Sequence, residues 1–132
     1  MELEDGVYWS MALDAESSVI ELVWTARTAA MTDQDFKEGV DHFTTFAEQH
    51  GATGLSVDVR EFGHQMNTEL GEWRQDKIVP RYNSAGIQRF AYVLPQGAPL
   101  EEPTQYEGEN FKTGYFSSPE AASSWLAAAP RE

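Results

Sequence analysis

The residues that could do chemistry in this chain are three histidines and a few carboxylates near the ends of predicted strands. His42, His50 and His64 lack HxxxH or HExxH spacing, whereas a zinc site needs three or four convergent ligands. The chain has no cysteine, which excludes disulfides, thiolate metal sites and a cysteine nucleophile. It also lacks a glycine-rich phosphate loop and a GxSxG element. We therefore expect no metal site, no cofactor and no catalytic residue, and hence a protein that is not an enzyme.

Asp58 is the carboxylate whose position most suggests a function, because it lies near the end of the predicted strand Leu55 to Val59. Acidic residues at the carboxyl ends of strands often bind ligands in open α/β sheets. Arg60 follows on the same face of the strand, so a local ion pair explains Asp58 as well, and we favour it. An enzyme that uses Asp58, His64 and a nearby acid is the last interpretation, and the spacing offers it no convergent set.

The connection from Arg60 to Asn67 leads from the end of this strand to the start of a predicted helix. Ligands and partners bind at this edge in sheets of this kind. Trp73 on the helix also suits a core position. The predicted binding rim comprises Asp58, Arg60, Phe62, His64, Asn67, Thr68 and Trp73.

The elements that must position the rim begin with a hairpin. Apolar and polar residues alternate from Val7 to Leu13, which predicts a strand with one buried face, and Val19 to Thr25 predicts an antiparallel partner. The polar DAESS segment between them suits the turn. Helix and buried-strand patterns then alternate to the C-terminus. This order predicts one α/β domain over 1–132, with a mixed sheet flanked by helices.

Local signals predict where the helices begin and end. Thr32 is a predicted N-cap, and His50-Gly51 ends the helix that follows. Asn67 and Thr68 are both competent N-caps for a second helix, which Pro80 either ends near Val79 or kinks.

The C-terminal third of the chain predicts two strands and a helix. Ile87 to Leu94 is the most apolar strand, so we expect it in the middle of the sheet with both faces covered. Phe111 to Phe116 predicts an edge strand. Ser118-Pro119-Glu120 begins the final helix, which Ala129-Pro130 is expected to end.

The composition restricts the partners. The 132 residues carry a net charge of −13, from 22 acidic and 9 basic side chains, which disfavours binding to nucleic acid and to anionic membranes. No apolar run approaches the ~20 residues that cross a bilayer, and Met1 to Asp5 is acidic, unlike a secretory leader. We expect a cytoplasmic protein that neither inserts into membranes nor binds nucleic acid.

The order of elements resembles that of the SpoIIAA-like proteins, which share the STAS fold with Sec14-like lipid carriers. The resemblance rests on LSVDV at 55–59, AGIQRFAYVL at 85–94 and FSSPEAA at 116–122. It implies a βαβα mixed sheet and, as in the antagonist members, protein binding that is switched by phosphorylation at the start of the second helix. The Asp-Ser-Ser-Gly run of those members is missing here. Thr68 stands near that place, where it could accept a phosphate or act as an N-cap.

The resemblance implies a non-catalytic protein-interaction or regulatory module whose protein partner binds the rim. The alternative is a Sec14-like carrier of a small apolar ligand or lipid, which the density of aromatic residues also suggests. Aromatic side chains in a domain of this size are, however, more often core than pocket. The aromatic residues concerned are Trp9, Trp24, Phe43, Phe46, Trp73 and Phe90. An unpaired strand at Phe111 to Phe116, or on the outer side of the hairpin, would allow a homodimer.

Overall fold

Six strands form one mixed sheet in which the spatial order follows the chain, in a computed structural model that describes residues 1–128. The first three strands are antiparallel neighbours, and β3 to β6 are parallel to one another. The strands are β1 (Glu2–Asp5), β2 (Trp9–Asp14), β3 (Val19–Trp24), β4 (Gly54–Asp58), β5 (Arg89–Val93) and β6 (Lys112–Phe116). The predicted α/β architecture with a mixed sheet is confirmed.

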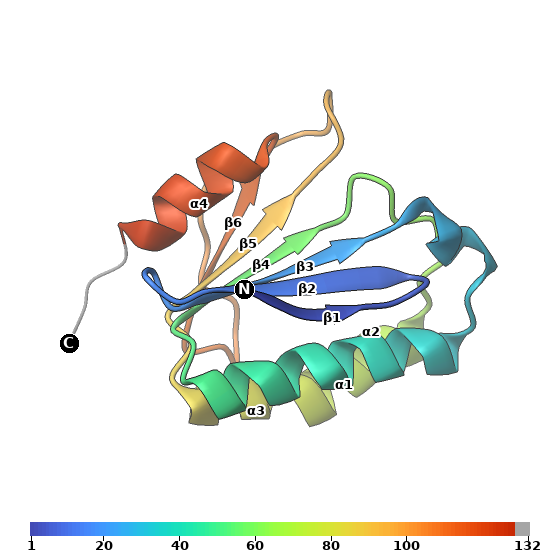
Figure 1. The fold of residues 1–132 in the computed structure, drawn as a ribbon, viewed down its shortest axis with the longest axis horizontal. Helices are drawn as coiled ribbons and strands as arrows, with labels where there is room; N and C mark the ends of the chain where they lie inside the picture. Colours follow the sequence, from blue (N-terminus) through green and yellow to red (C-terminus); the bar gives the residue numbers. More distant parts are fainter. Residues whose placement is uncertain (129–132) are drawn as a thin grey trace.

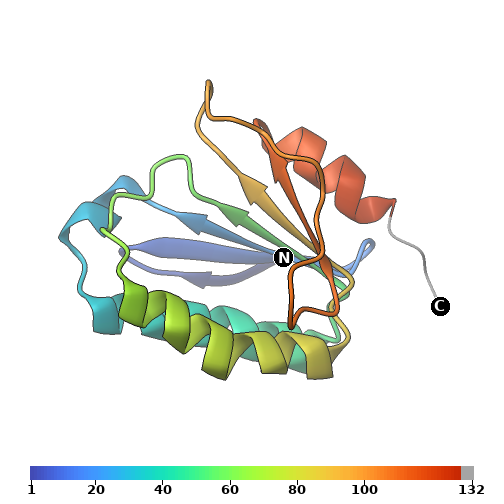
Figure 2. The ribbon, with the colours of Figure 1, turned by 180° about the vertical axis from the view of Figure 1, so that it is seen from behind.

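Helices cover both faces of the sheet (Figure 1). Helix α1 (Asp33–His50) lies on one face beside a second helical rod, which consists of α2 (Thr68–Trp73), the π-helical segment η2 (Arg74–Ile78) and α3 (Val79–Ala85). Figure 2 shows this rod and α1 side by side from behind. Helix α4 (Pro119–Ala127) covers the opposite face at the β5–β6 end. A short 3-10 helix, η1 (Ala26–Ala30), leads from β3 to α1.

The ends of α1 form as the sequence predicts. The Thr32 hydroxyl accepts from the Asp35 backbone N–H at 3.1 Å, and the Asp35 carboxylate accepts from the Thr32 N–H at 2.9 Å. This reciprocal capping box satisfies two N–H groups that the helix itself leaves without partners. Gly51 ends the helix with φ +62°, a left-handed conformation that glycine adopts at little cost.

The two faces of the sheet bury separate cores. On the α1 face, β3 contributes Ile20, Leu22 and Trp24 to a large aromatic cluster. On the α4 face, Val93 packs in a smaller cluster with Leu126. β5 pairs with β4 and β6 and contributes to both clusters, so both of its faces are covered, as predicted. It does not lie in the middle of the sheet as expected, because it is the fifth of six strands and neighbours the edge strand β6.

One strand was not predicted, and one predicted edge is partly shielded. Glu2–Asp5 forms β1, which pairs with β2 and covers the outer side of the hairpin, so that side is not a free edge. Its ELED sequence has little strand propensity, which is why the alternation pattern did not reveal it. β6 is the opposite edge strand, as predicted. On the outer side of β6, Thr104 exchanges two backbone hydrogen bonds with Thr113, at 2.9 and 2.8 Å. This pairing shields part of the β6 edge.

The second helix does not end near Val79, the first of the two predicted alternatives, because η2 continues directly into α3. The Val79 N–H donates to the Arg74 carbonyl, five residues back, and α3 begins at Val79 with Pro80 as its second residue. The π turn places the proline, which has no N–H, in the first turn of the next α-helical segment. Ser118 is the N-cap of α4, as predicted. The predicted end at Ala129-Pro130 lies outside the described residues.

Candidate ligand-binding cavity

Asp58 and Arg60, two of the predicted rim residues, form an ion pair in which the carboxylate is buried. The side chain of Asp58 is 5% exposed, and Arg60 binds it through Nη2 at 2.7 Å and through Nε at 3.1 Å to each carboxylate oxygen. The Arg60 backbone N–H also donates to Asp58 Oδ1 at 3.0 Å. The Asp58 carboxylate is therefore fully engaged by its neighbour, which supports the structural interpretation of this acid.

Three more rim residues lie near the start of α1, on the opposite face of the sheet. His64 Nε2 lies 2.8 Å from Asp33 Oδ1, and the Asn67 amide donates to Asp33 Oδ2 at 3.0 Å. These hydrogen bonds, from Asn67 first and then His64, lower the pKa of Asp33 below its ordinary value. Phe62 packs edge-on against Phe36, with ring centroids 6.0 Å apart. Asp33 thus joins the β4–α2 connection to α1.

The last two rim residues lie on α2. Asn67 is the N-cap of this helix and accepts from the Leu70 N–H at 2.9 Å, so Thr68 is its first residue and not its cap. Thr68 is exposed. Trp73 is partly buried against Phe36, and Lys37 Nζ lies 5.7 Å from the Trp73 ring centroid.

The rim residues therefore separate into two groups. Asp58 lies on the sheet face opposite the large aromatic cluster, because it alternates with Leu55 and Val57 of that cluster. Phe62 and Trp73 pack against the large cluster itself. The seven residues do not form one contact surface, because Asp58 is buried and lies on the other face of the sheet from Phe62 and Trp73. The expected protein interaction stays a prediction.

The large aromatic cluster lines a cavity that is partly open to solvent and that the sequence did not reveal. Its volume is about 390 Å³, and it lies between the sheet and the helical layer of α1 and η2–α3. Val59 and Leu94, which follow β4 and β5, line it, so it lies beneath the carboxyl ends of the parallel strands. Met66 also lines it and is 45% exposed, so the cavity reaches the surface there. Its aromatic lining includes Trp24, Phe36, Phe43, Phe62, Phe90 and Tyr92.

Of the described residues, 1–128, Arg74 is the one charged residue that lines this cavity. Its guanidinium carbon lies 5.4 Å from the Phe90 ring centroid and 5.9 Å from that of Tyr82. Arg74 Nη1 is 3.7 Å from Glu109 Oε2, on the loop between β5 and β6. Burial opposes the charge, but Tyr92, Tyr82 and Glu109 nevertheless raise the pKa of Arg74 above its ordinary value. The cavity therefore has a permanently cationic group in an otherwise uncharged wall.

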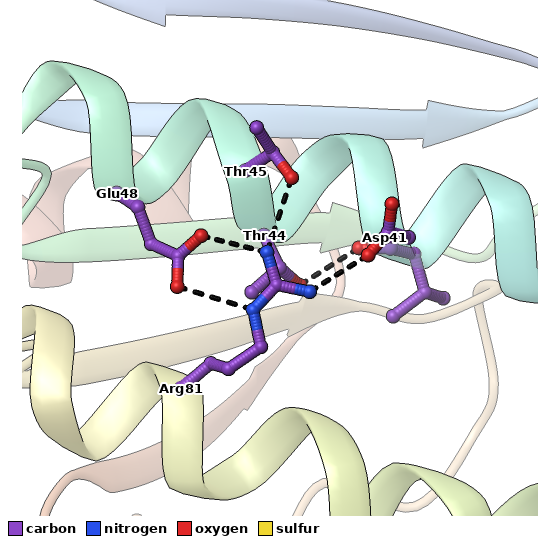
Figure 3. Close-up of polar contacts among 6 residues, drawn as sticks. Asp41, Thr44, Thr45, Glu48 and Arg81 are labelled. Carbon is purple, nitrogen blue, oxygen red and sulfur yellow. Dashed lines mark hydrogen bonds and ion pairs between the residues drawn. The ribbon is translucent and has the colours of Figure 1, made fainter.

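A second arginine holds the helical layer together (Figure 3). Arg81 of α3 donates to Glu48 at 2.6 and 3.1 Å, to Asp41 at 2.7 Å and to the Thr45 hydroxyl at 3.1 Å. All three acceptors belong to α1. Hydrogen bonds from Arg81 lower the pKa of Glu48. This network fixes α3 beside α1 and so sets the width of the layer above the cavity.

The pattern of a metal site is absent among the other titratable groups in the described part of the chain. Within residues 1–128, no three histidine, aspartate or glutamate side chains converge as metal ligands would. His42 instead contacts Glu4 of β1 at 2.9 Å. No helix between residues 1 and 128 combines the length and the apolar character needed to cross a membrane.

Comparison of the chain with protein-family models, with curated proteins and with solved structures finds no match. The resemblance to the SpoIIAA-like proteins therefore stays a prediction.

Proposed function

We propose that this protein is a non-catalytic binding module that holds a small apolar ligand in the cavity between the sheet and the helical layer. The observation that carries the proposal is the cavity itself, with a volume of about 390 Å³. Protein interiors contain few voids larger than a water molecule. Ligand pockets typically measure about 300–1,000 Å³ and have mainly apolar and aromatic walls. This cavity lies at the lower end of that range, which favours a small ligand.

The location of the cavity supports the same proposal. Ligands in open α/β sheets bind beyond the carboxyl ends of the parallel strands, which is where Val59 and Leu94 line the wall. Three of the aromatic residues named for a carrier, Trp24, Phe43 and Phe90, line the cavity. Asp58 is engaged by Arg60, so we assign this acid no role toward the ligand.

Calorimetric titration with decanol, an uncharged ligand with an apolar body, tests the proposal. Val57 lines the cavity from β4, and Val57→Phe should fill part of the space and abolish binding. Val23 of β3 alternates with the cavity-lining Leu22 and Trp24, so its side chain points to the other face of the sheet. Val23→Phe is therefore the matched control and should bind decanol as the wild type does.

Two results would contradict the proposal. The first is no heat of binding for decanol with the wild-type protein. The second is equal binding by Val57→Phe and the wild type, because the ligand would then lie elsewhere. Native mass spectrometry of the purified protein provides an independent measurement, since a bound natural ligand would add its mass.

A further inference from the structure

The guanidinium of Arg74 makes few of the hydrogen bonds that it could make. An arginine carries five N–H donors in a planar fork. Among residues 1–128, Glu109 is the one carboxylate paired with Arg74, at 3.7 Å, whereas charge-assisted N–H···O⁻ bonds measure about 2.7–2.9 Å. No fully enclosed side-chain nitrogen or oxygen in that range lacks a partner. The nitrogens of Arg74 that lack a protein partner are therefore not fully enclosed, in keeping with a side chain that is 23% exposed. Arg74 is also a lining residue of the cavity, so a ligand there would lie beside it.

A cation in an apolar wall is costly unless a partner compensates it. The rings of Phe90 and Tyr82 compensate part of the charge through cation–π contacts, and Glu109 compensates part of it at long range. A pocket that bound only hydrocarbon would gain nothing from this cation. The planar fork of arginine matches a carboxylate, which it can bind through two parallel hydrogen bonds.

The backbone around Arg74 is also unusual. Arg74 is the first residue of the π-helical segment η2, and its carbonyl accepts from the N–H of Val79. Such π turns are rare and occur frequently at functional sites. This local geometry gives a second, independent reason to regard Arg74 as more than a structural residue.

We propose that the ligand of the cavity carries a carboxylate, which Arg74 binds through its guanidinium while the apolar body lies among the aromatic side chains. The inference rests on the proposed function, because it specifies the polar end of the same ligand. A fatty acid of medium length has this chemistry.

Glu109 gives the proposal a distinctive consequence. The Glu109 side chain is 6% exposed and lies beside the guanidinium, so a ligand carboxylate at Arg74 would be a second negative charge next to it. Like charges in a partly buried site repel each other. Removal of the Glu109 charge should therefore strengthen the binding of a carboxylate and leave the binding of an alcohol unchanged.

The experiment compares decanoate with decanol by calorimetry, on the intact protein and at a pH where decanoate is ionised. Arg74→Met should weaken decanoate binding about tenfold or more, which corresponds to the loss of one charged hydrogen bond, and should leave decanol within about threefold of wild type. Glu109→Gln should strengthen decanoate binding severalfold. Arg27, which is exposed on η1, provides the matched control, and Arg27→Met should bind both probes as the wild type does.

A double variant guards against misfolding. Arg74→Met leaves Glu109 buried without its cation, which destabilises the protein, whereas Arg74→Met with Glu109→Gln removes both charges. The double variant should bind decanol as the wild type does. It should bind decanoate more weakly than Glu109→Gln alone does, because only the single variant keeps Arg74. Equal effects of Arg74→Met on decanoate and decanol would overturn the carboxylate proposal while the cavity remained a binding site. Failure of both probes to bind the wild type would overturn the proposed function as well.

Discussion

Two glycines in helices should respond in opposite directions to the same substitution. Gly39 lies inside α1, and a Cβ atom there would be 2.8 Å from Trp24 Cη2 and 2.9 Å from Trp9 Cε3. Gly71 lies inside α2, and a Cβ atom there would meet nothing within 4 Å. Alanine stabilises a helix interior by about 0.5–1 kcal/mol relative to glycine. Both substitutions thus gain helix propensity, and only Gly39→Ala adds close contacts with other side chains.

The steric contribution should decide the result at Gly39. Trp24 and Trp9 are 3% and 8% exposed, so neither indole can move freely away from a new methyl group. Overpacking of a core costs about 1–3 kcal/mol, which exceeds the gain in helix propensity. We expect Gly39→Ala to lower the free energy of unfolding by about 1 kcal/mol or more, and Gly71→Ala to raise it by about 0.5–1 kcal/mol.

Urea denaturation followed by circular dichroism measures both changes. Unchanged m-values would show that the shifts in midpoint reflect stability alone. In thermal unfolding, 1 kcal/mol corresponds to about 4 °C for a chain of this length. Stabilisation by both substitutions, to similar extents, would refute the close approach of α1 to the two indoles, and with it the position of the helical layer above the cavity.

Three further substitutions test local features. Burial raises the pKa of Tyr82 to about 12. The protonated phenol therefore stabilises the fold fully below pH ~10, and this stabilisation is lost as the pH rises through ~12. Tyr82→Phe should make the free energy of unfolding fall less steeply over this alkaline range. The pKa of Asp33 is lowered, so its ionised carboxylate stabilises the fold above pH ~4, and this stabilisation is lost as the pH falls through the lowered pKa. In an acid titration monitored by fluorescence, the stability of Asp33→Asn should decline less steeply than that of the wild type. Loss of the capping box in Thr32→Ala should cost about 1 kcal/mol in urea denaturation, and Thr32→Ser should restore it.

Local signals in the sequence predicted much of the fold. The ends of α1 follow from Thr32 and Gly51, whose capping preferences depend on backbone geometry and not on distant contacts. Alternation predicted the β2–β3 hairpin for the same reason. β1 was missed because its stability comes from pairing and from the Glu4 contacts to Trp9, at 2.6 Å, and to His42. Such contacts depend on tertiary structure, and the acidic sequence gives no sign of them.

The cavity could not be predicted because its walls come from separate elements. The periodicity of each strand indicates which side chains face the helical layer but not how closely the two layers approach each other. Arg74 occurs in a polar run, RQDK, where an exposed charged side chain is the ordinary expectation. Arg74 begins the π turn that precedes Pro80, and of these two features only the proline was visible in the sequence.

The contacts around the cavity explain how it persists in a small domain. An unfilled apolar space weakens a core, because the atoms of its wall lose packing partners. Collapse of the helical layer would recover those contacts, but three attachments oppose it. Gly39 brings α1 into contact with the sheet at Trp24, and Arg81 ties α3 to α1 at a fixed distance. Asp33 holds the β4–α2 connection at the start of α1. A layer fixed in this way preserves a space that packing alone would close, and an apolar ligand would restore the missing contacts without moving any of the three attachments.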